Sequence, residues 1–389
     1  MRHDRIKTGM LVLVSIAIGW IAWSGNVLLL PAALAFPLLW SSSSTRASAA
    51  LIAAGYFLAA SRGLPQGVGT YYAADLWPGL LLWLLASFSF VLVHAVLWTE
   101  HQGWHRATRY LIVVILMAVP PLGITGWAHP FTAAGVLFPG WGWVGLAVTT
   151  AGLAFVTSRL SPVVAVIFVS SWIWSVATWT NPNPPDLWRA VDLQMGATLG
   201  RDNSLQRQQQ LIETARSVAT DSRGSTVVLP ESALGFWTPT ASRLWQSSLS
   251  GTKMTVIGGA VVIDTGGYDN VLVEVSAKGS RVIYRERMPV PGAMWQPWLS
   301  WFRQSGGARA HFFDNPVVDV SSTQVATLIC YEQLIVWPIL QSMTHDPDII
   351  VAVANGWWTE GTAIIDIQRA SAEAWARLFD MPLVFSFNR

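Results

Sequence analysis

The sequence predicts a multi-span α-helical membrane domain followed by an α/β sandwich domain. Of its 389 residues, 52% are hydrophobic and only 12% are charged, whereas about a quarter of the residues are charged in ordinary soluble domains. Up to Thr180 the chain holds 8 Lys and Arg against 3 Asp and Glu, and the remainder holds 16 against 19. The two parts therefore face different solvents, and only the first consists of long apolar runs.

Seven apolar runs are predicted to be transmembrane helices within residues 1–180, because roughly 17 to 25 apolar residues cross a hydrocarbon core of about 30 Å. The runs are Thr8–Trp23, Asn26–Trp40, Ala47–Ala60, Ala74–Trp98, Ala107–Trp127, Phe131–Val156 and Leu160–Trp179. The second and third runs are short and could instead form one re-entrant pair. The first run would also suit a signal peptide, but the runs that follow favour an uncleaved helix.

The basic residues between the runs predict the orientation, since short cytoplasmic loops collect Lys and Arg. With the N-terminus in the cytoplasm, only Arg62 falls on the outer side. The residues on the inner side are Arg2, Arg5, Lys7, Arg46, Arg106, Arg109 and Arg159. Seven crossings then put the second domain on the outer face, which is the periplasmic face of a bacterial inner membrane.

The apolar runs contain almost no ionisable side chain that could take part in ion or proton transport. His94 is the one titratable candidate for their interior, and ion or proton pathways depend on intramembrane charges, so a pump or coupled transporter is disfavoured. His101 and His105 have a spacing that could bind metal on a helix, but a solvated loop is the favoured interpretation. We predict no metal, no cofactor and no direct contact with nucleic acid.

The sequence NPNPP at Asn181–Pro185 ends the last run, and residues 181–187 are predicted to be a linker. Within residues 188–389, helices alternate with short strands, as in an α/β sandwich. The predicted helices are Asn203–Ser222, Ala241–Ser250, Trp337–Met343 and Ile364–Phe379. The predicted strands are Thr226–Leu229, Met254–Ile263, Val271–Val275, Arg281–Tyr284, Val317–Val320, Val325–Cys330, Ile349–Ala354 and Leu383–Phe387, with a hairpin turn at Lys278.

Two stretches of the second domain could carry chemistry. Cys330, the only cysteine, ends a predicted strand, and a thiol with a nearby base can attack acyl carbons. The alternative is an inert small hydrophobe in the core. Glu231 follows a short apolar strand in VVLPESA, where a partly desolvated carboxylate could act as a general base or could simply begin a helix. Glu332 is a second possible partner of the thiol, or a surface group.

Four stretches resemble the nitrilase, or carbon-nitrogen hydrolase, superfamily in their order and approximate spacing. They are Leu229–Glu231, Tyr284–Pro291, Ile329–Glu332 and Ala354–Trp357. The resemblance implies an αββα sandwich that uses a Glu-Lys-Cys triad. With the membrane helices in front, the chain is similar to apolipoprotein N-acyltransferases. It is most similar to membrane proteins of plasmid conjugal transfer, on the stretches RMPVPGAMWQPW and FSFNR.

The resemblance implies a role for each matching residue. Cys330 would be the nucleophile, Glu231 the general base and Glu332 a supporting acid, and the backbone N–H of Tyr331 would meet the developing oxyanion. The position of the family lysine holds Glu286. Arg285 or Arg287 could supply a positive charge, although arginine does not readily exchange a proton. The implied activity is N-acyl transfer or amide hydrolysis, and the alternative is a catalytically inactive scaffold of the conjugation machinery.

The run AMWQPWLSWF carries four aromatic rings, Trp295, Trp298, Trp301 and Phe302. Buried indoles would each need a partner for the ring N–H, whereas a bilayer surface offers both apolar and wet surroundings. We predict a membrane-lying arm that guides a lipid chain toward Cys330; the alternative is that the rings fill the sandwich core. The expected partners are membrane lipids, with a phospholipid as acyl donor, and conjugation proteins.

Overall fold

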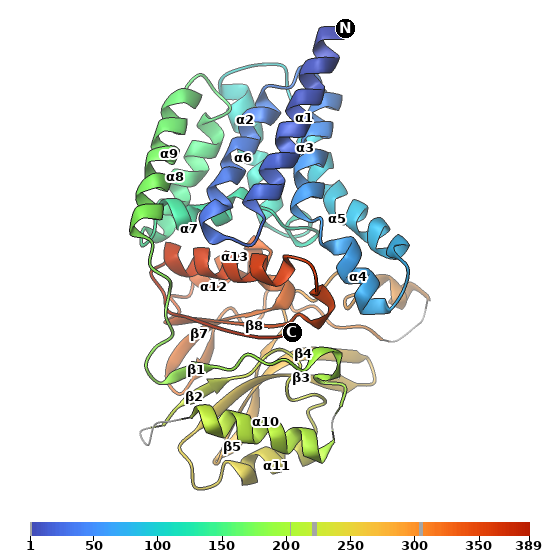
Figure 1. Cartoon of the computed structure of the whole chain (residues 1–389), viewed down its shortest axis with the longest axis vertical. Coiled ribbons are helices and arrows are strands. Elements are labelled where there is room, and N and C mark those ends of the chain that lie inside the picture. The colour runs from blue at the N-terminus through green and yellow to red at the C-terminus, as the bar shows by residue number, and fades with distance from the viewer. Residues whose placement is uncertain (1, 203, 220–223, 303–305) are drawn as a thin grey trace. The chain divides into compact units, whose positions relative to one another are not determined.

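The computed structural model describes residues 2–202, 204–219, 224–302 and 306–389 (Figure 1). The chain forms two compact units. The first comprises Met1–Pro182, Leu334–Trp337 and Gly361–Met381, and the second comprises Asn183–Gln333, Pro338–Glu360 and Pro382–Arg389. The change of unit after Pro182 lies within the predicted linker, but two later segments join the first unit.

The first unit is entirely helical in the part that the structure describes. Its α-helices are α1 (Arg2–Ala22), α2 (Phe36–Ser41), α3 (Arg46–Ala60), α4 (Leu64–Tyr72), α5 (Leu76–Leu97), α6 (Trp104–Ala118), α7 (Ala134–Leu137), α8 (Gly142–Phe155), α9 (Ser161–Thr178) and α13 (Ile364–Leu378). The 3₁₀ helices are η1 (Val27–Ala35), η2 (Leu122–Ile124) and η3 (Pro130–Ala133). Helix α13 joins this unit because α7 lies against it: a Cβ on Gly135 would come within 1.7 Å of the Ala374 carbonyl oxygen.

Fewer helices than predicted are long enough to cross a membrane. Among the described residues, three qualify by length and composition, Asp4–Ala22, Leu76–Leu97 and Ser161–Thr178, and α3 with α4 would add a fourth if that pair, bent by 49°, is one span. Seven crossings therefore stay a prediction, and three of the seven runs form single helices long enough to span. Proline is the main reason that fewer helices are long enough, since it removes a backbone donor and breaks regular helix: Pro31 and Pro37 interrupt the second run, and α6 ends two residues before Pro120.

The second unit contains two mixed sheets. The first has the order β1-β2-β3-β4-β5 and the second β6-β7-β8-β9. The strands are β1 (Trp188–Ala190), β2 (Thr226–Val228), β3 (Thr255–Asp264), β4 (Gly267–Ser276), β5 (Gly279–Arg285), β6 (Val318–Val320), β7 (Thr323–Ile329), β8 (Ile349–Asn355) and β9 (Leu383–Asn388). Each predicted strand is confirmed, while β1 was missed because its sequence, WRA, contains no apolar or β-branched run.

Parallel and antiparallel pairing occur in both sheets. Strands β1, β2 and β3 run parallel to one another, and β3, β4 and β5 are antiparallel neighbours. In the second sheet, β6 is antiparallel to β7, whereas β7, β8 and β9 are parallel. The hairpin between β4 and β5 turns at Lys278, which is exposed as predicted. Parallel pairing brings the carboxyl ends of β7 and β8 to one edge.

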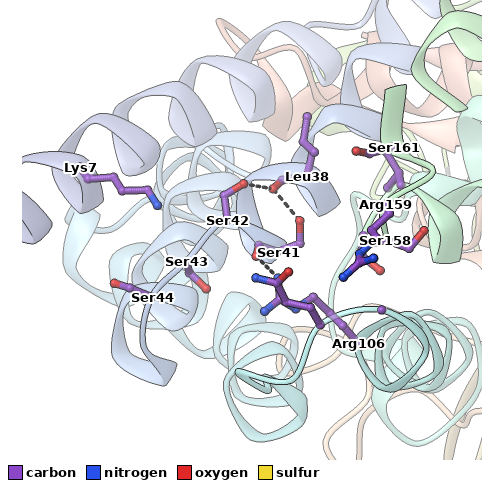
Figure 2. A pocket seen from close by; sticks show the side chains of 14 residues that line it. Lys7, Leu38, Ser41, Ser42, Ser43, Ser44, Arg106, Ser158, Arg159 and Ser161 are labelled. Atoms are coloured by element: carbon purple, nitrogen blue, oxygen red, sulfur yellow. Dashed lines mark hydrogen bonds between the residues drawn. The ribbon is translucent and has the colours of Figure 1, made fainter. Parts of the chain in front are cut away.

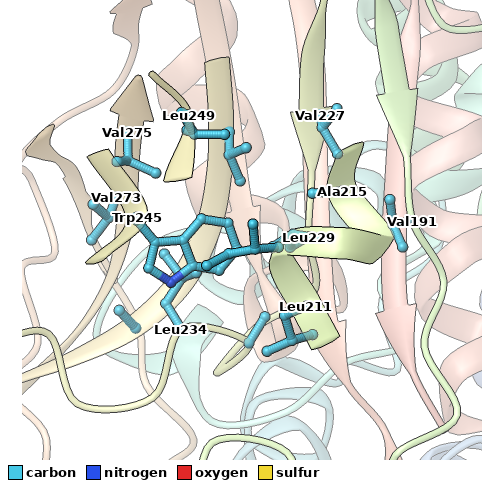
Figure 3. Packing of buried hydrophobic residues seen from close by; sticks show 14 of the residues in the cluster. Val191, Leu211, Ala215, Val227, Leu229, Leu234, Trp245, Leu249, Val273 and Val275 are labelled. Atoms are coloured by element: carbon cyan, nitrogen blue, oxygen red, sulfur yellow. The ribbon is translucent and has the colours of Figure 1, made fainter. Parts of the chain in front are cut away.

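Two apolar clusters form the core of this unit. One lies between the first sheet and helices α10 (Leu205–Val218) and α11 (Pro239–Ser248), around Trp245 (Figure 3). The other contains residues of both sheets, among them Val228 and Val351. Val227 belongs to the first cluster and Val228 to the second, as the alternation of side chains along a strand requires. Of the predicted helix Asn203–Ser222, residues 203 and 220–222 lie outside the described part.

The remaining helices of the second unit are short. They are η4 (Gly196–Thr198), η5 (Pro297–Phe302), η6 (Cys330–Gln333) and η7 (Trp357–Thr359). Helix α12 (Val336–Met343) begins in the segment that belongs to the first unit and continues in the second. The 3₁₀ turn η6 matters most for function, because it opens on the single cysteine.

Candidate active site

Cys330 lies at a sharp turn between β7 and η6. Its φ is +44°, a left-handed conformation that costs a residue with a Cβ about 1–2 kcal/mol. The side chain is buried, with 5% exposure. Strained backbone of this kind persists where the surrounding structure holds it, and it occurs often at active sites. The turn ends β7 directly before Cys330.

Glu231 is the direct partner of this thiol. The Cys330 side chain hydrogen-bonds to the Glu231 carboxyl, which also accepts bonds from Asn270 Nδ2 to Oε1 (2.8 Å) and from the Asn355 N–H to Oε2 (3.0 Å). Burial raises the pKa of Glu231, and the bonds from Asn270, Asn355 and Cys330 act in the opposite direction. The result is an oriented carboxylate that is more basic than an exposed glutamate.

Gly259 of β3 allows Glu231 to occupy this place. A Cβ on Gly259 would come within 2.5 Å of both Glu231 Cα and the Ser232 nitrogen. Ser232 itself has φ +65°, so the chain turns sharply after Glu231. The sequence carried a signal of this contact, since two consecutive glycines inside an apolar strand mark a close approach of backbone.

Glu286 lies directly after β5 and is completely buried. Asn270 Nδ2 donates to Glu286 Oε2 (2.9 Å) as well as to Glu231, so a single amide joins the two carboxyls. Among the described residues, Glu286 Oε1 and Asn270 Oδ1 have no hydrogen-bond partner. Burial and the nearby charges of Glu332 and Glu231 hold the pKa of Glu286 well above its ordinary value. Burial with few compensating donors therefore favours the neutral, protonated form of Glu286.

Glu332, two residues after the cysteine, has a different environment. It accepts bonds from the Tyr284 hydroxyl (2.8 Å) and from three backbone N–H groups, those of Arg287 (2.7 Å), Met288 (3.1 Å) and Ile329 (2.8 Å). Arg287 Nε lies 3.9 Å from its Oε1. Burial has the largest effect and raises the pKa of Glu332 above its ordinary value, while the charge of Arg287 and the bonds from Ile329, Tyr284 and the Arg287 N–H oppose this rise. Four donors and a cation favour the ionised form, which ties the end of β5 to the end of β7.

The two predicted arginines lie in separate places. Arg287 is completely buried, and the N–H groups of its guanidinium donate to Tyr284 Oη, Pro338 O, Gln341 Oε1, Thr327 O and Ser342 Oγ. Arg285 pairs with Asp269, which also binds Arg309 and His311. Neither guanidinium bonds to Glu231 or Cys330, so oxyanion stabilisation by an arginine is a prediction that this geometry does not favour.

The other predicted site residues are Tyr331 and the aromatic residues of the run 293–302. Tyr331 follows Cys330 directly in η6, where the resemblance would use its backbone N–H. Trp301 is 80% exposed and Trp298 39% exposed, while Trp295 packs edge-on against Phe312 with 5.4 Å between ring centroids. The exposure of two indoles argues against their filling the sandwich core. The side chain of Phe302 lies outside the described part of the structure.

Comparison with known proteins identifies the family of this chain. A model of the carbon-nitrogen hydrolase family matches residues 58–377. The chain belongs to the carbon-nitrogen hydrolase family. It is 62% identical over 388 residues to the probable conjugal transfer protein TraB of Sinorhizobium fredii, covering 100% of both chains. It is 57% identical over 398 residues to the conjugal transfer protein TraB of Agrobacterium fabrum, covering 100% of this chain and 94% of the relative.

Solved structures are more distant. A carbon-nitrogen hydrolase of Helicobacter pylori is 13% identical and aligns with 51% of this chain and 72% of its own, with a TM-score of 0.36, which is too low to add to the description of the fold. The predicted resemblance to the superfamily and to conjugal transfer proteins is confirmed by the family match and by the two close relatives.

Sequence reasoning missed the residues that donate hydrogen bonds to these carboxyls, Asn270, Asn355 and Tyr284. Asn270 had a detectable signal, because Asp269 and Asn270 are polar residues, depleted in strands, within an otherwise apolar strand. Among the described residues, no three His, Cys, Asp or Glu side chains gather as metal ligands would.

Proposed function

We propose that this protein carries out cysteine-dependent N-acyl transfer or amide hydrolysis at the periplasmic surface of a bacterial inner membrane, in support of plasmid conjugation. The observation that carries the proposal is the hydrogen bond between the Cys330 thiol and the buried Glu231 carboxyl. The relatives at 62% and 57% identity, both conjugal transfer proteins by name, supply the biological setting.

The first half of the reaction forms an acyl-enzyme. Glu231 takes the thiol proton while the sulfur of Cys330 attacks the acyl carbon, so that an S–C bond forms and the carbonyl electron pair moves to oxygen. The Tyr331 N–H donates to that oxyanion. When the carbonyl reforms, the bond to the alcohol or amine breaks, and protonated Glu231 gives its proton to the leaving group.

The second half releases the acyl group. An incoming amine or water gives a proton to Glu231 and attacks the thioester carbon; the C–S bond then breaks and the sulfur recovers the proton. In this scheme Arg287 is a positioning residue, because it holds Tyr284 and Glu332 rather than the reacting atoms.

Glu286 sets the rate of this chemistry in our proposal. A neutral carboxyl at the position of the family lysine offers one O–H donor to the site instead of an ammonium. Hydrogen bonds from ionised donors are roughly twice as strong as those from neutral ones, so the neutral acid stabilises an oxyanion less. We therefore expect slower turnover than in a relative that carries the lysine.

The arrangement of the first unit supports the proposed orientation. Lys7, Arg106 and Arg159 line one cavity together with Ser41–Ser44 (Figure 2). The first turns of α1 and the α2–α3, α5–α6 and α8–α9 connections therefore lie at the same end of the helices. Each segment between two of them leaves that end and returns to it, whether or not it crosses a bilayer completely. Helix α9 then starts at the same end as the N-terminus and is itself long enough to cross. A cytoplasmic N-terminus therefore puts the chain after Thr178 in the periplasm even if fewer than seven segments span.

The exposed indoles fit the proposed role of the 293–302 arm at the lipid surface. Trp298 and Trp301 present large apolar rings to the surroundings, and amphipathic rings favour the bilayer interface. A phospholipid that reaches the arm would be a suitable acyl donor for Cys330.

Intact-mass spectrometry tests the enzymatic proposal. The full chain, reconstituted in vesicles of phosphatidylethanolamine and phosphatidylglycerol, should gain one acyl group, and Cys330→Ala should gain none. Glu231→Gln should slow the gain about 100-fold or more, since general bases contribute 10²–10⁴-fold, whereas Glu213→Gln on an exposed helix face should not. If wild type gains no acyl group where a lysine-containing relative does, the protein is not an acyltransferase.

The second candidate function is a catalytically silent scaffold of the conjugation machinery. It is favoured by Glu286, which leaves the site without the family lysine. Under this hypothesis Cys330→Ala leaves the frequency of plasmid transfer unchanged. A large loss of transfer in a Cys330→Ala strain with wild-type protein levels eliminates the scaffold and favours the enzyme.

A further inference from the structure

A cavity of about 480 Å³ lies at one end of the first unit, remote in sequence from the residues of the candidate active site. Four parts of the chain surround it: the first turns of α1, the α2–α3 connection, the α5–α6 connection and the α8–α9 connection. Figure 2 shows Lys7 and Arg159 reaching toward the same serine-rich loop from different elements, with Arg106 beside it. The cavity joins segments that are distant in sequence into one polar site.

The lining of this cavity is strongly one-sided in charge. Lys7, Arg106 and Arg159 contribute cations, and no Asp or Glu is among the described residues that line it. Ser44 and Ser161 add hydroxyl groups. Cations that share a space without an acid repel one another, and an anion between them removes that repulsion and gains their attraction.

Arg106 is built into the site. Its side chain is nearly enclosed, with 8% exposure, and its guanidinium donates to the backbone carbonyls of Ser41, Thr99 and Glu100. Its Nε is buried and has no hydrogen-bond partner among the described residues. The three carbonyls hold the guanidinium in place beside the cavity, so its positive charge is fixed there before a ligand binds.

Two helices begin at this cavity without a side-chain cap. Gly103 precedes α6 and Leu160 precedes α9, and neither helix has a capping side chain. The first turn of a helix carries N–H groups without intrahelical partners and a partial positive charge. These helix ends add to the charge of the three cations, and both features favour a ligand with several oxygen acceptors.

We propose that this cavity binds a phosphate group. Phosphate has the charge that the lining lacks and enough oxygen atoms to accept from Arg106, Lys7, Arg159 and the hydroxyls at once. The volume exceeds that of one phosphate and is within the range of small-molecule sites, so the phosphate can belong to a larger molecule. Its source is either an anionic phospholipid headgroup or a soluble phosphate compound. The proposal does not depend on any chemistry at Cys330.

Isothermal titration of the full chain in uncharged detergent tests this site, at constant ionic strength so that general screening is held fixed. One arm uses inorganic phosphate, and the other uses a water-soluble short-chain phosphatidylglycerol. The test variant is Lys7→Gln with Arg159→Gln; both residues are exposed, so the fold should tolerate the change. The control is Arg5→Gln with Arg46→Gln, two exposed residues of the adjoining helices that do not line the cavity.

The test variant should bind at least tenfold more weakly, which corresponds to about 1.4 kcal/mol, while the control stays within twofold of wild type. Binding in both arms identifies a general phosphate site, and binding of the lipid alone identifies a headgroup site. The proposal is overturned if wild type binds neither ligand below about 10 mM. It is equally overturned if the control loses as much affinity as the test variant, because the attraction would then be diffuse surface charge.

Discussion

Glu286 and Glu332 are two carboxyls of the same buried region with opposite surroundings. Both are completely excluded from solvent. Glu332 accepts bonds from a tyrosine and three backbone N–H groups beside Arg287. Glu286 accepts a bond from Asn270, and its second oxygen has no partner among the described residues.

The difference separates a structural carboxyl from one that belongs to the chemistry. An ionised group is stable inside a protein only when charges and donors replace its water, and a carboxyl without them keeps its proton. Glu332 therefore acts as an anchor that holds the nucleophile turn. Glu286 remains as a proton-bearing group beside Glu231, in the position where the family resemblance leads one to expect lysine.

The largest expected effect on stability comes from removing Arg287, the cation beside Glu332. Arg287→Met leaves Glu332 buried without a counter-charge, which typically costs about 3–5 kcal/mol. We expect the full chain in detergent to unfold at a clearly lower temperature or denaturant concentration, followed by tryptophan fluorescence. A variant within about 1 kcal/mol of wild type would mean that Glu332 is already neutral, and the contrast between the two carboxyls would disappear.

A matched pair of amide substitutions compares the two carboxyls directly. Glu332→Gln puts an NH₂ group among backbone donors and removes a hydrogen-bonded charge, so we expect a loss of about 2–3 kcal/mol. Glu286→Gln replaces one neutral group with another of similar shape and should cost less than about 1 kcal/mol. Equilibrium unfolding of both variants under identical conditions decides the matter. Equal losses would show that both carboxyls are ionised anchors.

The pH dependence of stability should reveal the proton on Glu286. Because its pKa is raised in the folded state, the folded chain holds a proton that the unfolded chain releases above about pH 4.5. Its contribution to stability is complete below that pH and is lost as the pH rises toward the folded pKa. Glu286→Gln removes this loss. The free energy of unfolding of the variant should therefore rise relative to that of wild type between pH 5 and 7, by at most about 1.4 kcal/mol per pH unit. If the difference in unfolding free energy between wild type and Glu286→Gln is the same at pH 5 and pH 7, the pKa of Glu286 is not raised.

Much of the second unit could be predicted because its strands carry a clear pattern. The apolar run Thr226–Leu229 is visible in the sequence, and so is the end of the apolar run at Cys330. The spans of the first unit were harder, since hydropathy alone does not register that Pro31 and Pro37 interrupt an apolar run.

The side-chain partners within the site could not be predicted, because they depend on strand register. Strands β4 and β5 change register between Leu272 and Val273, so the sequence does not reveal whether Asp269 or Asn270 faces Glu231. Arg285 and Arg287 would share a face in a continuous strand, but β5 ends at Arg285. Arg287 therefore leaves the alternation and turns inward to Glu332, while Arg285 pairs with Asp269.

Because Arg285 lies apart from Arg287 and from the site, removing it should have the smallest effect on stability and activity. Arg285 is 39% exposed, and its partner Asp269 keeps Arg309 and His311 when it is removed. Ion pairs that water reaches contribute about 0–1 kcal/mol, so Arg285→Gln should change the free energy of unfolding by less than about 1 kcal/mol and should leave acyl-enzyme formation unchanged. Unfolding and intact-mass measurements beside Arg287→Met check both points. If a stable Arg285→Gln variant forms no acyl adduct, Arg285 supplies the positive charge that the family lysine would provide. The proposed role of Glu286 as a neutral hydrogen-bond donor in the site would then be unnecessary.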